Sequence, residues 1–296
     1  MNSEIIFEKY ESIRAILPRQ KTSPTSKRIT NIKEVLDEKS CLLFDAFGVL
    51  NAGDRPIKKA VEFLNTLKSE GTPFLILSNS ASTPKKEFHK KMCSMGYNIE
   101  LEDTITSREV LWSQFPKTDK TWGIIAQKQE LELPIDAVFQ DEEGFLDCDG
   151  FIFLCAKAWN DSLHVQWKES LRKNPREVWL ANPDITAPRG KQVFSKEAGF
   201  YTLLEDKYFS NSLRAVGKPF DVIFKHAMHI AKKRWGISKD NLIMVGDTLH
   251  TDILGSNSMG IKNILIEDYG FFEGLSSSAY IEKSGIFPDF IMSRYS

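Results

Sequence analysis

The sequence predicts an α/β protein with a doubly wound, Rossmann-like parallel-sheet core into which a second α/β domain is inserted. Two observations lead to this fold class. Short apolar runs alternate with helical stretches, which is typical of parallel strands joined by crossover helices. Strand and helix patterns of this kind also occur at both ends of the chain, so we expect the segment between them to leave the core and return to it.

The chain begins with a predicted helix. Ile6, Tyr10, Ile13 and Leu17 recur at helical spacing and form an apolar stripe. Docking of this stripe on the protein's own body is one reading, and contact with a partner is the other. Residues 21–28 are polar, contain a proline and lack periodicity, so they are predicted to be an exposed connector.

The core is predicted from two separate parts of the chain. In the first part, strands at residues 41–44 and 73–77 flank a helix at 57–68. In the second part, helices at 220–234 and 249–259 alternate with strands at 242–245 and 263–266. We expect the crossovers between parallel strands to be right-handed.

The inserted segment has strands and helices of its own. Apolar runs predict strands at residues 122–126, 136–139, 150–154 and 177–180, with helices around Ser107 and Trp167. An insert at this point would cover the carboxyl ends of the core strands, where such folds bind ligands, and would act as a cap. The predicted division is an N-terminal helix and linker (1–30), a core (31–83 and 216–296) and an inserted cap (84–215).

Composition excludes several functional classes. With 42% hydrophobic and 27% charged residues among 296, the chain has the balance of a globular protein and not of a disordered or membrane protein. The net charge is −1 and no long basic run occurs, so we expect small-molecule partners and neither nucleic acid nor membrane. The N-terminus lacks the pattern of a secretory signal, which predicts a cytoplasmic location.

Polar residues follow the predicted core strands. Asp45 follows the strand at 41–44 and can act as a nucleophile toward phosphorus, which would give an aspartyl phosphate. Gly48, in the same turn, would let backbone amides approach phosphoryl oxygens closely. A carboxylate and a glycine beside a strand are also ordinary turn residues, and this remains the alternative.

Ser78 and Lys218 are predicted to bind phosphate. The hydroxyl of Ser78 and the amide of Asn79, at the end of the second core strand, could hold a phosphoryl oxygen, although a turn pair is the alternative. Lys218 lies in a glycine–proline turn that restricts its position. Its ammonium could neutralise both Asp45 and the charge on the phosphoryl group, whereas the plain alternative is a solvated lysine.

Asp247 and Asp252 could face one cation. Mg²⁺ prefers oxygen ligands and takes one or two carboxylates plus a substrate phosphate, so Asp45 and Asp247 are predicted as direct ligands. Asp252 would orient a metal-bound water or the lysine. Capping of the helix that follows is the alternative for both aspartates.

Taken in order, these four segments resemble the motifs of the haloacid dehalogenase superfamily (residues 45–50, 75–79, 217–219 and 245–252). The position of the insert, and the Asn-Pro-Asp turn at 182–184, resemble the class IIA or NagD-like branch, which has a large α/β cap. The resemblance covers the chain from about residue 32 to its end.

The resemblance implies a magnesium-dependent phosphomonoester phosphatase that acts on a small phosphorylated metabolite. By match of motif, Asp45 would be the nucleophile and a metal ligand, Ser78 and Lys218 would bind phosphate, and Asp247 would bind the metal. Cap surfaces in this branch often pair, so a homodimer is one of the partners that the resemblance leaves open. Asn182 and Asp184 could line the cap face toward the site, although a turn-forming role is the alternative.

The sequence departs from the superfamily at Phe47. The first motif usually reads Asp-x-Asp-Gly, and the second aspartate supplies a proton to the leaving group, which a phenylalanine side chain cannot do. The backbone carbonyl of Phe47 can still bind a metal. General acid catalysis is worth about 10²- to 10⁴-fold in rate, so turnover without it would favour good leaving groups.

Three functional readings therefore stay open. A phosphatase could draw a replacement acid from elsewhere, with His250 and His164 as candidates. A binding or regulatory protein could keep the phosphate pocket with little turnover, a reading that Phe47 favours. A related transfer reaction through an aspartyl ester is the third reading, because one scaffold can host several chemistries.

Overall fold

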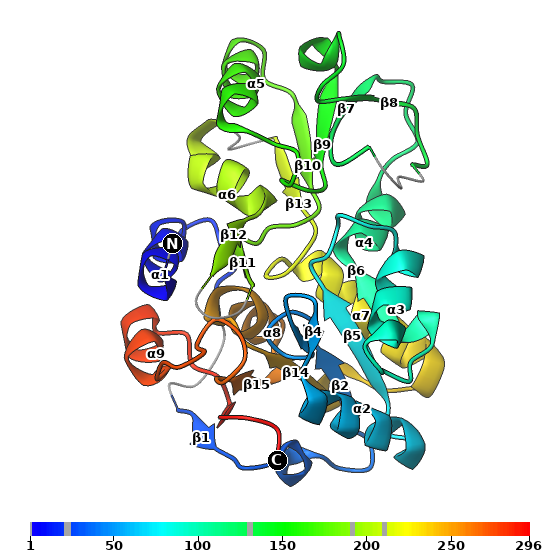
Figure 1. Cartoon of the computed structure of the whole chain (residues 1–296), viewed down its shortest axis with the longest axis vertical. Coiled ribbons are helices and arrows are strands. Elements are labelled where there is room, and N and C mark those ends of the chain that lie inside the picture. Colours follow the sequence, from blue (N-terminus) through cyan, green and yellow to red (C-terminus); the bar gives the residue numbers. More distant parts are fainter. Residues whose placement is uncertain (1, 21–24, 129–132, 190–192, 209–211) are drawn as a thin grey trace.

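The computed structural model describes residues 2–20, 25–128, 133–189, 193–208 and 212–296. Residues 21–24 of the predicted connector lie outside the described residues. Within them the chain forms a seven-stranded and a five-stranded parallel sheet, and Figure 1 shows the smaller sheet above the larger one. The predicted fold class is confirmed.

The larger sheet contains the predicted core strands. Its strands, in spatial order, are β1 (Lys27–Arg28), β16 (Phe290–Met292), β15 (Lys262–Ile266), β14 (Leu242–Gly246), β2 (Cys41–Phe44), β5 (Phe74–Ser78) and β6 (Thr104–Thr106). Every pair in this sheet is parallel. Because β2 pairs with β14 on one side and β5 on the other, the carboxyl ends of these three strands lie together.

Helices cover both faces of the larger sheet because its strands alternate apolar side chains between the two faces. Leu42 and Phe44 pack on one face with α2 (Lys58–Glu70) and α3 (Lys85–Ser94). Cys41 and Leu43 pack on the other with α4 (Ser107–Gln114) and α7 (Asp221–Trp235). The strands therefore read as continuous apolar runs, and polar residues begin where the strands end.

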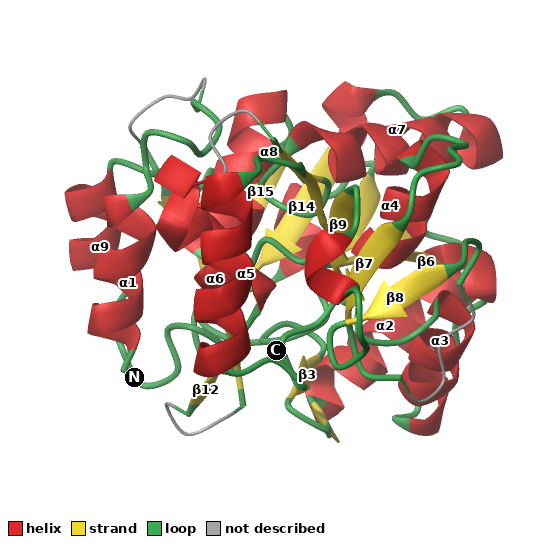
Figure 2. Cartoon of the chain, turned by 90° about the horizontal axis from the view of Figure 1, so that it is seen from above, coloured by secondary structure: helices red, strands yellow, loops and turns green. Residues whose placement is uncertain are grey.

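The smaller sheet and the elements between its strands form what we call the cap unit. Its strands, in spatial order, are β13 (Leu213–Ala215), β10 (Glu177–Leu180), β9 (Gly150–Phe153), β7 (Trp122–Ile125) and β8 (Ala137–Phe139). The cap unit also contains α5 (Asp161–Lys173), α6 (Ala198–Thr202) and the antiparallel hairpin of β11 (Thr186–Pro188) and β12 (Phe194–Lys196). Figure 2 shows α5 and α6 side by side at one flank of this unit.

The boundary of the cap unit differs from the predicted one. The predicted insert begins at residue 84, yet β6 lies beyond that point and pairs with β5 in the larger sheet. α4, which follows β6, contacts α7 of the core. A three-residue Thr-Ile-Thr strand is too short to produce a recognisable apolar run. We therefore propose that the cap unit begins between α4 and β7 and ends at β13.

The N-terminal helix α1 (Ser3–Ser12) docks on the protein. The side chain of Asn2 accepts a hydrogen bond from Ile5 N and caps the helix. The helix ends before Ile13, although Ile13 and Leu17 of the predicted stripe are still buried. In Figures 1 and 2, α1 lies beside α9 (Ser278–Ser284), a helix near the end of the chain.

Shorter elements complete the structure. The predicted helix at 249–259 is instead a π-helical turn (Leu249–Ile253) that leads into α8 (Leu254–Met259). A small hairpin and several 3₁₀ turns connect the other elements: β3 (Asn51–Ala52), β4 (Arg55–Pro56), Ile32–Val35, Leu101–Asp103, Phe145–Asp147, Leu203–Tyr208 and Lys239–Asn241. None of the helices in the described residues has the length and apolar character needed to cross a lipid bilayer.

Candidate active site

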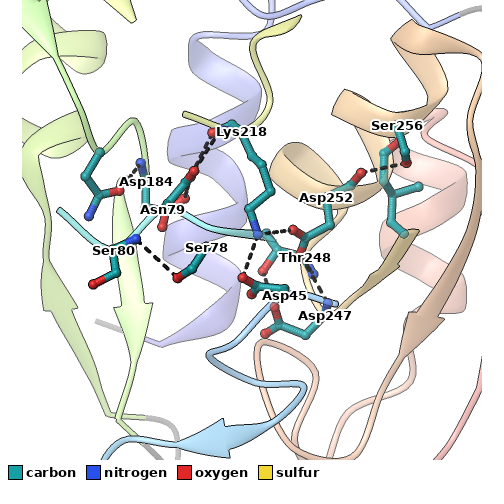
Figure 3. Close-up of polar contacts among 12 residues, drawn as sticks. Asp45, Ser78, Asn79, Ser80, Asp184, Lys218, Asp247, Thr248, Asp252 and Ser256 are labelled. Carbon is teal, nitrogen blue, oxygen red and sulfur yellow. Dashed lines mark hydrogen bonds and ion pairs between the residues drawn. The ribbon is translucent and has the colours of Figure 1, made fainter. Parts of the chain in front are cut away.

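Three carboxylates meet where the central strands of the larger sheet end. Asp45 follows β2 and Asp247 follows β14, and the register pairs Phe44, the last residue of β2, with Val245 near the end of β14. Asp252 comes from the π-helical turn after β14. Each side chain offers a carboxylate oxygen, and these oxygens lie within 4.8 Å of one another. Figure 3 shows the three side chains converging.

Lys218 binds two of the three carboxylates. Its Nζ donates to Asp45 Oδ1 at 2.5 Å and to Asp252 Oδ1 at 2.7 Å, and the residue is only 2% exposed. The side chain of Asn79 holds the backbone of Lys218 from both sides: Lys218 N donates to Asn79 Oδ1 (2.7 Å), and Asn79 Nδ2 donates to Lys218 O (2.9 Å). Asn79 thus positions the lysine that the sequence predicts to bind phosphate.

Asp252 has both carboxylate oxygens engaged. Oδ1 accepts from Lys218, and Oδ2 accepts from the backbone amides of Asp247 and Thr248, each at 3.2 Å. The carboxylate therefore fixes the loop that carries Asp247 and also fixes the lysine. This geometry suits the orienting role better than direct coordination of a cation.

Gly48 lies against the Asp247 carboxylate. Its amide donates to Asn51 O at 2.8 Å, so it is not offered to a phosphoryl oxygen. Its φ is +85°, and a Cβ at this position would lie 2.3 Å from Asp247 Oδ2. The glycine is required because the Asp247 carboxylate approaches the backbone closely.

The cluster brings three carboxyl groups together around one ammonium group. Burial raises the pKa of Asp45 to about 7, opposed by the Lys218 ammonium. Burial raises the pKa of Asp247 well above its usual value, and the charges of Asp252 and Asp45 add to this. Burial opposes the charge on Lys218, but Asp252, Asp45 and Asp184 outweigh it and raise its pKa. Three buried carboxylates around one ammonium form a donor set that fits an additional cation.

Two family models match the parts of the chain that build this cluster. Residues 42–135 match a haloacid dehalogenase-like hydrolase family, and residues 215–292 match a second family of hydrolases of the same type. The chain belongs to the haloacid dehalogenase-like hydrolases. The predicted resemblance to this superfamily is confirmed, and residues 136–214, most of the cap unit, lie between the two matches.

Several proteins are similar to this hydrolase over most of its length. Phosphoglycolate phosphatase 1A of Arabidopsis thaliana is 27% identical, over 92% of this chain and 79% of the relative. D-glycerol 3-phosphate phosphatase of Mycobacterium tuberculosis is 24% identical, over 79% of this chain and 65% of the relative.

Solved structures share its fold. A possible sugar phosphatase from Cytophaga hutchinsonii superimposes with a TM-score of 0.79 at 22% identity, covering 91% of this chain and 99% of that one. A 4-nitrophenylphosphatase from Thermotoga maritima gives a TM-score of 0.65 at 20% identity, covering 86% and 94%.

A cavity of about 570 Å³ adjoins the acidic cluster of this hydrolase. The core, the cap unit and α1 all contribute to its walls. They include the ends of β2, β5 and β14 and residues of α3 in the core, the loops after β9 and β10 with the hairpin β11–β12 in the cap unit, and Tyr10 of α1. Ser78, a predicted phosphate ligand, lines it together with Asp45 and Lys218. Residues of the core and of the cap unit therefore line one cavity at the carboxyl ends of the core strands.

Phe47 lines the same cavity. The ammonium of Lys91 lies 5.6 Å from the centre of its ring, and the guanidinium of Arg189 lies 5.8 Å from it. Arg189 follows β11, so the ring lies beside both the core and the cap unit. Nothing in this arrangement gives position 47 a group that can donate a proton.

The Asn-Pro-Asp turn joins the cap unit to the core. Asn182 Oδ1 accepts from Asp184 N at 3.0 Å, which is the turn-forming interaction. Asp184 Oδ1 accepts from Asn79 Nδ2 at 2.8 Å, and both Asn182 and Asp184 line the cavity. Burial raises the pKa of Asp184 to about 8, so this carboxyl group keeps its proton near neutral pH.

The two histidines considered as replacement acids do not line the cavity. His250 Nε2 lies 2.6 Å from Glu11 Oε1 of α1, and its ring is stacked on that of Tyr10. His164 is on α5, where its Nε2 lies 3.9 Å from Glu205. Neither histidine is among the residues that line the cavity, so the structure offers no support for either as the replacement acid.

Two contacts to Asp247 were not predicted. Phe271 N donates to Asp247 Oδ2 (2.7 Å), and Thr248 Oγ1 donates to Oδ1 (3.1 Å). The contact from Thr248 could have been predicted from the sequence, because Thr248 follows Asp247 directly. Phe271 contributes only a backbone amide, which no side-chain pattern signals. Gly270 precedes it for a steric reason, since a Cβ there would lie 1.9 Å from Asp247 Oδ2.

Proposed function

We propose that this chain is a phosphomonoester phosphatase that depends on Mg²⁺ and forms an aspartyl phosphate on Asp45. The single observation that carries the proposal is the position of Lys218 Nζ, which binds both Asp45 and Asp252 at the base of the cavity. A buried ammonium next to a carboxylate at a strand end supplies a nucleophile and a counter-charge for the phosphoryl group. The named phosphatases among the relatives support the same reaction class.

The chain's own residues provide the two steps. An Asp45 carboxylate oxygen attacks phosphorus and displaces the alcohol, and water then hydrolyses the acyl phosphate to regenerate the carboxylate. Lys218 holds the attacking carboxylate and neutralises charge on the phosphoryl oxygens, while the Ser78 hydroxyl binds one of those oxygens. The side chain of Asn79 binds the backbone of Lys218 and so keeps this residue in place.

The acidic cluster fits Mg²⁺ because it holds three carboxyl groups and only one lysine, and a bound cation would favour the ionised form of those groups. Asp45, Asp247 and the backbone carbonyl of Phe47 would hold the ion, and Asp252 would orient its surroundings. When bound, Mg²⁺ supplies charge stabilisation and polarises phosphoryl oxygens.

The reaction is tested with purified protein, 4-nitrophenyl phosphate and acetyl phosphate, with Mg²⁺ or with a chelator. Release of phosphate that requires Mg²⁺ is the expected result. Binding of phosphate without release would favour the second candidate function, a phosphate-binding protein with little turnover, which the presence of Phe47 in the cavity supports.

Asp247→Asn is expected to weaken the metal dependence specifically. The amide keeps the contacts of one oxygen but removes the negative charge, so the Mg²⁺ concentration for half-maximal activity should rise by about tenfold or more. The measurement is a Mg²⁺ titration of phosphate release at saturating substrate. An unchanged titration curve would show that Asp247 is not a ligand.

Phe47→Asp is expected to raise kcat for alkyl phosphates by at least about tenfold, because it introduces the missing general acid. Aryl and acyl phosphates, whose leaving groups need little protonation, should change less. The measurement compares glycerol 3-phosphate with 4-nitrophenyl phosphate in both proteins. Absence of any gain would mean that another group already donates the proton, and Asp184, whose pKa burial raises to about 8, is a candidate among the carboxyl groups of the cavity.

A further inference from the structure

The N-terminal helix reaches the candidate active site through Tyr10. Ser3 Oγ donates to Phe271 O (2.9 Å), in the core loop whose Phe271 amide binds Asp247. At the other end of the helix, the Tyr10 hydroxyl oxygen accepts from Ile185 N (3.1 Å) in the cap unit. Because α1 binds both the core and the cap unit, it forms part of the wall between them.

The ring of Tyr10 is held in one position. It stacks on the ring of His250, with centroids 4.9 Å apart and planes 10° apart, and His250 in turn binds Glu11 of the same helix. Tyr10 is 2% exposed and lines the cavity. A side chain fixed in this way loses little conformational entropy when a ligand binds next to it.

The hydroxyl of Tyr10 can still donate one hydrogen bond. Its oxygen accepts from Ile185 N, but among the residues that the structure describes there is no acceptor for its proton. Buried tyrosine hydroxyls usually have such a partner. Burial raises the pKa of Tyr10 well above its usual value, and the charges of Asp184 and Asp247 add to this, so the phenol stays protonated. An available donor therefore lies beside the Asn-Pro-Asp turn, on the cap side of the cavity.

We propose that Tyr10 is a substrate-contacting residue whose hydroxyl donates a hydrogen bond to the alcohol part of the phosphate ester. The inference rests on the proposed function and narrows its substrate class. Lys218 and Ser78 serve the phosphoryl group at the strand ends, whereas the Tyr10 hydroxyl is bound to the cap unit, which faces the rest of the substrate. The favoured esters are those whose alcohol part carries an oxygen acceptor, such as a hydroxyl or carboxylate. No proton is transferred by Tyr10.

The test measures binding in the Asp45→Asn protein, which retains the cavity without the nucleophile. Calorimetric titrations with 2-phosphoglycolate, glycerol 3-phosphate and inorganic phosphate, all with Mg²⁺, compare this protein with the same protein carrying Tyr10→Phe. The second substitution removes only the hydroxyl and keeps the ring stacked on His250. Binding of at least one ester should weaken about tenfold, as for loss of one neutral hydrogen bond, while inorganic phosphate should bind equally well.

Tyr280→Phe is the matched control. Tyr280 is on α9 and packs against Phe7 of α1 with ring centroids 5.0 Å apart, but it does not line the cavity. Removing its hydroxyl alters the same helix interface without reaching the substrate, so all three ligands should bind as before. A loss equal to that of Tyr10→Phe would assign the effect to helix docking and overturn the proposed contact.

Other outcomes separate this inference from the proposed function. The contact is overturned if both esters bind the Tyr10→Phe protein as tightly as the protein with Tyr10. It is also overturned if Tyr10→Phe weakens the binding of inorganic phosphate as much as that of the esters. If no ester binds more tightly than inorganic phosphate, the alcohol part is not recognised and the inference fails as well. The expected binding pattern, combined with no hydrolysis when Asp45 is intact, would retain the contact and overturn the phosphatase.

Discussion

Asp45→Asn is expected to lower kcat for 4-nitrophenyl phosphate by a factor of about 10³ or more, which is the range for loss of a nucleophile. The amide cannot form the aspartyl phosphate, whereas a residue that only bound the phosphate would affect KM more than kcat. Single-turnover and steady-state assays with Mg²⁺ measure both constants. Activity near that of the unaltered protein would rule out Asp45 as the nucleophile.

The same substitution is expected to leave the protein folded and at least as stable. Burial raises the pKa of Asp45 to about 7, which means that its charge is costly inside the protein. Removing it leaves Lys218 paired with Asp252. Urea unfolding should therefore give an unchanged or higher free energy of unfolding. Asp221→Asn, at an exposed carboxylate on α7 outside the cavity, is the control and should retain activity.

The strand ends could be predicted from the sequence because each one changes abruptly from apolar to polar. Four buried residues precede Asp45, and the buried strand β14 precedes Asp247. In a parallel sheet such residues lie at one edge whatever the details of packing, so order along the chain was sufficient to bring the two together. Lys218 follows no core strand and was selected instead for the glycine–proline turn that restricts its backbone.

Residues whose role depends on packing could not be predicted in this way. Tyr10 belongs to an apolar stripe, and its contact with Ile185 spans 175 residues, so only the docking of α1 makes this residue part of the cavity wall. His250 is adjacent to the last motif, yet the π-helical turn directs its ring toward Glu11. Gly48 was selected for its missing side chain, but the close approach of the Asp247 carboxylate to its backbone was not predicted.

Lys218→Met is expected to destabilise the protein by about 3–5 kcal/mol, the usual cost of removing one partner from a buried ion pair. Methionine fills a similar volume without charge, so Asp45 and Asp252 would lose the ammonium that both bind. Urea unfolding at neutral pH without Mg²⁺ measures the effect. Lys225→Met, which removes an exposed lysine paired with Asp221 on α7, should leave the free energy of unfolding almost unchanged.

A second substitution shows whether the destabilisation by Lys218→Met comes from repulsion between the carboxylates or from a loss of packing. In the Lys218→Met protein, Asp252→Asn removes one of the uncompensated charges while keeping an oxygen that can accept from the Asp247 and Thr248 amides. If charge is the cause, the double variant should be more stable than Lys218→Met alone, so that the two effects are not additive. A double variant less stable than Lys218→Met would mean that Lys218 stabilises the fold through packing. The position of Lys218 beside Asp45 would then not support a cluster whose carboxylates need an additional cation.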